Sequence, residues 1–134
     1  MLVAVDGSAS ASEAFGRAIY LAQKCNSKLD LVHVVQCELG GDSAGTFEII
    51  EELKDKARKM LEEYRVEAAK NNVPIQITIT QGDPAKVIIE LAKAKGYDLI
   101  IMGTRGRSSF QELLIGSVSQ KVMHHASCPV MVVR

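Results

Sequence analysis

The sequence has no excess of charge of either sign. Sixteen Lys and Arg residues balance sixteen Asp and Glu residues in a chain of 134 residues. No global field therefore draws the protein toward nucleic acid or an anionic membrane, and neither is expected as a partner. The charge of any ligand must be met by local groups.

Cysteine is scarce and long apolar runs are missing. Cys25, Cys37 and Cys128 are widely spaced, without a CxxC pair or a zinc-ligand pattern, which is typical of reduced thiols in a cytosolic protein. No apolar run approaches the roughly 18 residues of a membrane span. The N-terminal segment also lacks the basic region of a signal peptide, so we expect a cytoplasmic location. The first apolar run starts abruptly at Leu2, and the natural chain is expected to begin at least one residue earlier.

Several motifs of catalysis and metal binding are also missing. There is no GxxxxGK(S/T), which excludes a P-loop enzyme, and the turn at residues 6–10, DGSAS, lacks the GxGxxG dinucleotide fingerprint. His124 and His125 are adjacent, so on a helix they point in different directions, and no third zinc ligand is apparent. Cys128 has no evident activating partner, which favours a packing role.

Short apolar runs alternate with helical patterns along the chain. Five runs rich in β-branched residues predict strands at residues 2–5, 29–35, 75–80, 99–102 and 130–133. Between them, periodic apolar residues predict helices over 8–25, over 46–72 with an apolar face from Phe47 to Ala68, after Asp83 and Pro84, and over 117–125. This alternation predicts a single α/β domain over residues 1–134, doubly wound, with a mainly parallel sheet covered by helices on both faces. The 75–80 run alternates with polar residues, so we place it at a sheet edge.

The segment from Gly103 to Ser119 carries the strongest functional signal. Gly103 and Gly106 have no Cβ, so their backbone can approach a ligand closely or adopt a positive φ. Gly116, Ser117, Val118 and Ser119 place backbone N–H groups and two hydroxyls at a predicted helix N-terminus, which is suited to phosphate. The alternative is structural: the glycines only make a turn, and Ser117 is only an N-cap.

The spacing of these glycines resembles a family signature. Gly103, two residues, Gly106, nine residues and then Gly116-Ser117 is similar to the nucleotide-binding motif of the universal stress protein family. VAVDGS at 3–8, YDLIIMGTRG at 97–106 and SCPVMVV at 127–133 also resemble that family's landmarks. The resemblance implies a five-stranded parallel sheet of order 3-2-1-4-5, of the adenine nucleotide alpha hydrolase-like type. It also implies the family's ATP-binding branch.

The resemblance and the general rule for open α/β sheets indicate one crevice. With that strand order, Asp6 and Gly103 end neighbouring strands at the topological switch point. The resemblance implies a site for ATP, or for ADP or AMP, formed by Val5, Asp6, Gly7, Val34, Val35, Met102, Gly103, Arg105, Gly106, Gly116, Ser117, Val118 and Ser119. Asp6 is a candidate for a nucleotide-bound Mg²⁺, a ribose hydroxyl or the adenine edge, or else it caps the following helix. Arg105 could pair with phosphate or remain a solvated loop residue.

Three functions fit this sequence. The first is a nucleotide-responsive stress or signalling adaptor with an unknown protein partner. The second is a slow ATPase or phosphate-transfer enzyme using the same crevice, which is disfavoured because no general base, P-loop lysine or pair of metal carboxylates is evident. The third is a dimeric chaperone-like or scaffolding protein. We also expect a homodimer, joined through an apolar edge strand formed by Val130, Met131, Val132 and Val133.

Overall fold

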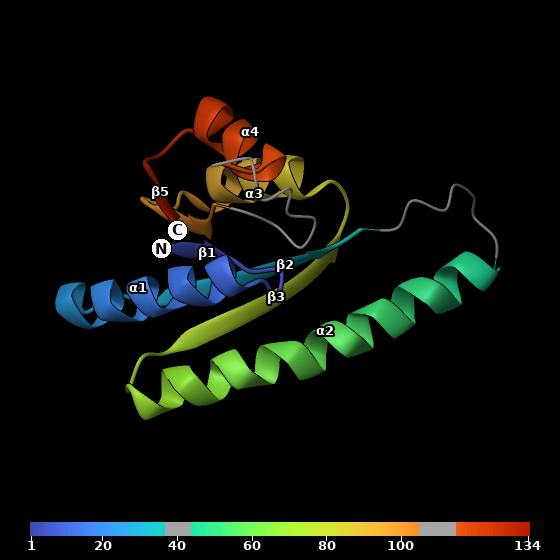
Figure 1. The fold of residues 1–134 in the computed structure, drawn as a ribbon, viewed down its shortest axis with the longest axis horizontal. Coiled ribbons are helices and arrows are strands. Elements are labelled where there is room, and N and C mark those ends of the chain that lie inside the picture. Colours follow the sequence, from blue (N-terminus) through green and yellow to red (C-terminus); the bar gives the residue numbers. More distant parts are fainter. Residues whose placement is uncertain (37–43, 105–114) are drawn as a thin grey trace.

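The computed structural model describes residues 1–36, 44–104 and 115–134 (Figure 1). Predictions made for Cys37, Arg105 and Gly106 therefore lie outside the described residues. The strands are β1 (Leu2–Ala4), β2 (Leu29–Val35), β3 (Ile75–Gln81), β4 (Ile100–Gly103) and β5 (Val130–Val133), and the helices are α1 (Ala9–Cys25), α2 (Ala44–Lys70), α3 (Pro84–Lys95) and α4 (Ser117–His125).

The five strands form one parallel sheet of order β3-β2-β1-β4-β5. Figure 1 shows α1 and α2 on one side of this sheet and α3 and α4 on the other. The predicted doubly wound α/β fold and its strand order are therefore confirmed. The expectation that the 75–80 run lies at an edge is also confirmed, because β3 pairs only with β2 in this sheet.

Local chemistry explains both boundaries of α3. Asp83 is the N-cap of α3, its carboxylate accepting the Lys86 N–H at 3.0 Å, and Pro84 follows at the first helical position. Gly96 ends α3 with a φ of 65°, a left-handed conformation that glycine adopts without strain. Several boundaries differ from the prediction by one or two residues. The observed elements β1 (Leu2–Ala4), β3 (Ile75–Gln81), β4 (Ile100–Gly103), α1 (Ala9–Cys25) and α2 (Ala44–Lys70) replace the predicted ranges 2–5, 75–80, 99–102, 8–25 and 46–72.

The core has two layers, one on each face of the sheet. Under α1 and α2, Phe15 packs edge-on against Tyr64, with ring centroids 4.8 Å apart, over the buried side chains of Val3 and Ile101. Under α3 and α4, Ile88 and Val122 belong to a second cluster with Leu2, Ile100 and Met102. Both faces of the central strands are buried, which explains why their sequences are almost continuously apolar.

None of the helices in the described parts of the chain combines the length and hydropathy that a membrane span requires. The longest helix, α2, has 27 residues and carries charged residues along its length.

Candidate functional site

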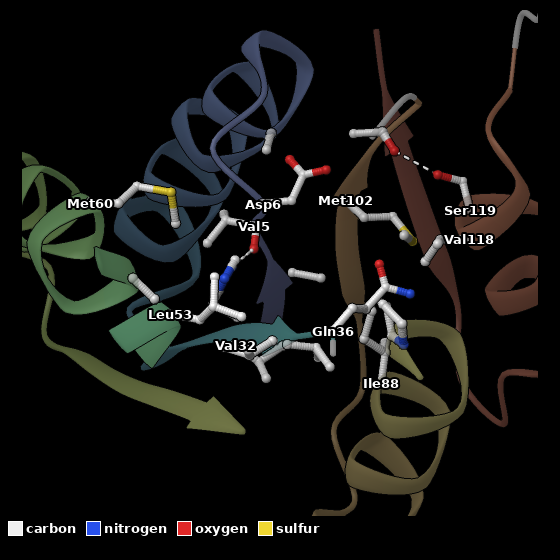
Figure 2. A pocket seen from close by; sticks show the side chains of 18 of the residues that line it. Val5, Asp6, Val32, Gln36, Leu53, Met60, Ile88, Met102, Val118 and Ser119 are labelled. Atoms are coloured by element: carbon white, nitrogen blue, oxygen red, sulfur yellow. Dashed lines mark hydrogen bonds between the residues drawn. The ribbon is translucent and has the colours of Figure 1, made fainter. Parts of the chain in front are cut away.

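A cavity of about 490 Å³ opens where the carboxyl ends of β1, β2 and β4 meet. The neighbours β1 and β4 pair from Leu2↔Ile100 to Ala4↔Met102, and the helices that follow them, α1 and α4, cover opposite faces. In Figure 2, Leu53 and Met60 of α2 close one side, and Val118 and Ile88 close the other. This is the switch point at which α/β sheets bind ligands.

The turn after β1 carries Asp6 into this cavity. The Val5 N–H still pairs with β2, donating to the Val32 carbonyl at 3.0 Å. The Asp6 carboxylate then accepts the Ser8 N–H at 2.9 Å, and Gly7 takes a φ of 83°, which favours glycine. Ser8 is the N-cap of α1, its hydroxyl accepting the Ala11 N–H. The N-cap interpretation of Asp6 is therefore wrong, because Asp6 stabilises the turn before the cap.

His33 holds the same turn from β2. Its Nδ1 lies 2.8 Å from the carbonyl oxygen of Val5. Because a carbonyl oxygen only accepts, Nδ1 carries the hydrogen. This residue lines the cavity, and sequence reasoning missed it. Its place near the carboxyl end of a strand beside β1 was the available signal.

Among the described residues, no side chain caps the N-terminus of α4. Gly116 is the N-cap, with φ −74° and ψ 165°, and Ser117 is the first helical residue. The structural alternative, in which Ser117 is only an N-cap, is thus wrong. The first bond of the helix runs from the Gln120 N–H to the Gly116 carbonyl at 3.0 Å. The N–H groups of Ser117, Val118 and Ser119 precede it and have no acceptor within the helix.

Gly103 and Ser119 fix α4 to the sheet. The buried Ser119 hydroxyl donates to the Gly103 carbonyl at 2.7 Å (Figure 2). A Cβ built on Gly103 would lie 2.7 Å from the carbonyl carbon of Ser10 and 2.9 Å from the nitrogen of Ala11, closer than such atoms approach. Glycine is required here by the close approach of α1, and not by a positive φ as one alternative expected.

Few charged groups of the described residues line the cavity. Asp6 provides a carboxylate, and Lys56 lines the α2 wall while pairing with Glu52 at 3.8 Å. Burial raises the pKa of the neighbouring Tyr64 hydroxyl, the hydrogen bond with Ser12 lowers it, and the charge of Asp6 adds to the increase. In the described part of the chain, no three His, Cys, Asp or Glu side chains are grouped to hold a metal ion.

Comparison with known proteins gives the family. The model of the Universal stress protein family matches residues 1–134. The chain belongs to this family. Universal stress protein YxiE of Bacillus subtilis is 36% identical over 144 residues, covering 100% of this chain and 97% of that protein. The solved structure of universal stress protein UspA from Lactobacillus plantarum matches with a TM-score of 0.92 and 28% identity, covering 99% of this chain and 95% of that one.

A second solved structure is relevant to the site. A universal stress protein in complex with cAMP matches this chain with a TM-score of 0.77 and 25% identity, covering 99% of this chain and 94% of that one. The cavity of the present chain brings together most of the residues that the family resemblance implied for the site. Those that line it are Val5, Asp6, Val34, Val35, Met102, Gly103, Val118 and Ser119.

Other predicted residues stand apart from the cavity lining. Gly7 and Ser117 each adjoin a lining residue in the chain, Gly116 lies two residues before Val118, and none of the three lines the cavity. Arg105 and Gly106 lie outside the described residues. The wall from α2 was not predicted, because that helix follows β2 and nothing in its sequence indicates which part faces the cavity. Besides His33, the lining residues missed are Ala4, Ala11, Val32, Gln36, Leu53, Lys56, Ala57, Met60, Pro84 and Ile88.

Proposed function

We propose that this universal stress protein binds an adenine nucleotide, ATP or its relatives ADP and AMP, and acts in the cytoplasm as a nucleotide-responsive stress or signalling adaptor. The observation that carries the proposal is the uncapped N-terminus of α4 beside an apolar cavity. Free backbone N–H groups and the helix dipole favour phosphate. The related protein in complex with cAMP supports an adenine nucleotide as the ligand class.

The cavity suits the two ends of such a ligand. Its volume of about 490 Å³ is in the range of small-molecule sites, roughly 300–1,000 Å³. Val34, Met102 and Val118 give it apolar walls on the α3 and α4 side, suited to the faces of a purine. Phosphates would extend to Ser117–Ser119. Arg105 and Gly106 belong to the proposed site through the family resemblance alone.

Asp6 is the proposed protein contact for a nucleotide-bound Mg²⁺. A single carboxylate is enough for that role, because Mg²⁺ is commonly held by one or two carboxylates together with substrate phosphates and water. The Asp6 carboxylate already accepts one N–H through Oδ1, which leaves its second oxygen for the ion or for a ribose hydroxyl.

Slow hydrolysis is the second candidate. Asp6 and His33 line the cavity and are able to accept a proton, but each already holds the turn after β1. We therefore propose turnover below the ordinary enzyme range of about 1–1,000 per second. A contaminant-controlled rate above about one per second, lost in a variant that does not bind ATP, would identify an enzyme.

Gly116→Val is the decisive test of nucleotide binding. A branched side chain at this position would stand where backbone must meet phosphate, so we expect ATP–Mg²⁺ affinity to fall at least about a hundredfold. The fold should survive, because the extended backbone of Gly116, φ −74° and ψ 165°, is open to valine. Calorimetric titration measures the affinity, and circular dichroism checks the fold.

Gly16→Val is the matched control for that titration. Gly16 is exposed on α1, and a Cβ built there meets nothing within 4 Å. This variant should bind ATP like the wild type. Unchanged ATP affinity in folded Gly116→Val would refute the phosphate site.

A separate measurement identifies the ligand. Mass spectrometry of ligand released from denatured protein would show which nucleotide the protein carries from the cell.

The proposal includes a homodimer through β5. This strand lies at the sheet edge, and its four apolar residues, Val130–Val133, are all half-buried in the isolated chain. An edge of this kind invites pairing with a second chain.

A further inference from the structure

The side chain of His33 takes the place of a strand partner for Val5. Beyond the end of β1, the Val5 N–H donates to the Val32 carbonyl at 3.0 Å, and the Val5 carbonyl accepts from His33 Nδ1 at 2.8 Å. Both polar backbone groups of Val5 are therefore held by two successive residues of β2. The hydrogen bond from His33 joins residues 28 positions apart in sequence, so it fixes one strand end relative to another.

A histidine is not explained by packing at this position. Side chains alternate along β2, and the neighbours of His33 on the same face, Leu31 and Val35, are buried members of an otherwise apolar stripe. The paired residue on β3 is Ile79. A branched aliphatic side chain would continue the stripe, whereas the imidazole introduces a polar group that needs a partner. Among the described residues, the partner that the structure provides is the Val5 carbonyl, at the turn that enters the cavity.

The turn held by His33 is the one that presents Asp6. After Val5, the chain passes through Asp6 and Gly7, with the Asp6 carboxylate accepting the Ser8 N–H at 2.9 Å, and reaches the N-cap of α1. Ser8 holds the far end of this turn, and His33 holds the near end. Losing the near contact would free the Val5 carbonyl and let Asp6 move relative to β4.

We propose that His33 is a positioning residue of the nucleotide site, which fixes Asp6 in the cavity by donating a hydrogen bond from Nδ1 to the Val5 carbonyl. The inference rests on the proposed nucleotide binding and adds a residue that acts on the site through the turn. The hydrogen on Nδ1 is a direct signature of the contact, because the other neutral tautomer carries its hydrogen on Nε2 alone.

Two amide substitutions test whether nucleotide affinity depends on a hydrogen-bond donor at the position of Nδ1 or on the size of the side chain. In His33→Asn the short amide places an N–H near the position of Nδ1, whereas in His33→Gln the amide lies farther out, near the position of Nε2. We expect His33→Gln to lower ATP–Mg²⁺ affinity about tenfold, the effect of one lost hydrogen bond. His33→Asn should recover most of that loss. Calorimetric titration gives the affinities, and His125→Gln, at the exposed end of α4, is the matched control.

The tautomer of wild-type His33 provides a second test that needs neither a variant nor a ligand. Nitrogen-15 correlation spectra of the imidazole should show hydrogen on Nδ1, and hydrogen on Nε2 alone would overturn the proposal. It is also overturned if folded His33→Gln binds like the wild type, or if Asn and Gln lose affinity equally. If the wild type binds no adenine nucleotide, the proposed function fails, while the tautomer and the amide shifts of Asp6 and Gly7 in His33→Gln still decide whether His33 holds the turn.

Discussion

Gly103 occupies the closest contact between the sheet and α1. A Cβ there would meet the backbone of Ser10 and Ala11 at 2.7 and 2.9 Å. We expect Gly103→Ala to lower the free energy of unfolding by about 1–3 kcal/mol, because the helix and strand must move apart. Urea unfolding measures the change. Gly103→Ala stability within about 0.5 kcal/mol of the wild type would show that α1 can shift freely.

Ser10→Ala in the Gly103→Ala background separates side-chain from backbone contacts. The added Cβ also meets the Ser10 hydroxyl, and removing that oxygen relieves this contact but leaves both backbone contacts. The double variant should therefore recover only part of the lost stability. Full recovery of stability in the double variant would show that the contact with the Ser10 hydroxyl alone destabilises Gly103→Ala.

At the residue scale, the sequence predicted which residues lie at the site better than it predicted the interaction that each residue makes. Asp6 and Ser8 are both good caps, and only the turn geometry shows that Ser8 caps α1 while Asp6 accepts an N–H within the turn. Ser119 was predicted for its hydroxyl, which the structure directs to the Gly103 carbonyl. The contact of His33 depends on two strand ends meeting in space, and no local pattern contains that information.

At the scale of the element, α1 contains a glycine that lowers the stability of the helix without any need for close packing. Gly16 lies in the middle of this helix on its exposed side, with no atom within 4 Å of a built Cβ. Gly16→Ala should raise the free energy of unfolding by about 0.5–1 kcal/mol, because alanine loses less backbone entropy in a helix. Urea unfolding measures this gain, and ATP affinity should not change. A loss of stability would indicate that this face of α1 packs against something in solution.

The other elements show where periodicity is reliable. The start of helix α3 was predicted from Asp83 and Pro84, whereas no position was predicted for its end, which the structure places before Gly96. Helix α2 was predictable in its second half, where Ala57, Leu61, Tyr64 and Ala68 are buried. Its first half departs from the predicted apolar face, since Phe47 is 67% exposed. Periodicity identifies an apolar stripe, but tertiary contacts decide how much of it is covered.

At the scale of the whole molecule, strand order determines where the site lies. Alternating strands and helices predict a parallel sheet, but they do not say that β1 and β4 are neighbours. The order came from resemblance to the family and is confirmed by the pairing of β1 with both β2 and β4. Once that pair is central, Asp6, Gly103 and the N-terminus of α4 meet at one end of the sheet. The strand order therefore brings the described residues of the glycine signature to the end of the sheet at which the cavity opens.

The open edge of β5 makes a testable prediction about assembly. The carbonyls of Pro129 and Val133 accept N–H groups from Ile100 and Thr104, at 3.0 and 2.9 Å. Because backbone direction alternates along a strand, the polar groups of Met131 also face β4, and those of Val130 and Val132 face outward. A two-fold antiparallel pairing of two β5 edges would use these outward groups.

Proline should therefore act with a period of two along β5. Val130→Pro and Val132→Pro remove outward N–H groups and should convert the dimer to a folded monomer, whereas Met131→Pro removes an inward N–H and should lower stability instead. Val132→Ala, which keeps the N–H, is the matched control and should remain more dimeric than Val132→Pro. Sedimentation at micromolar concentration measures assembly, and urea unfolding measures stability. A monomeric wild type, or folded dimers in both Val130→Pro and Val132→Pro, would exclude β5 as the interface, because edge pairing depends on those two N–H groups.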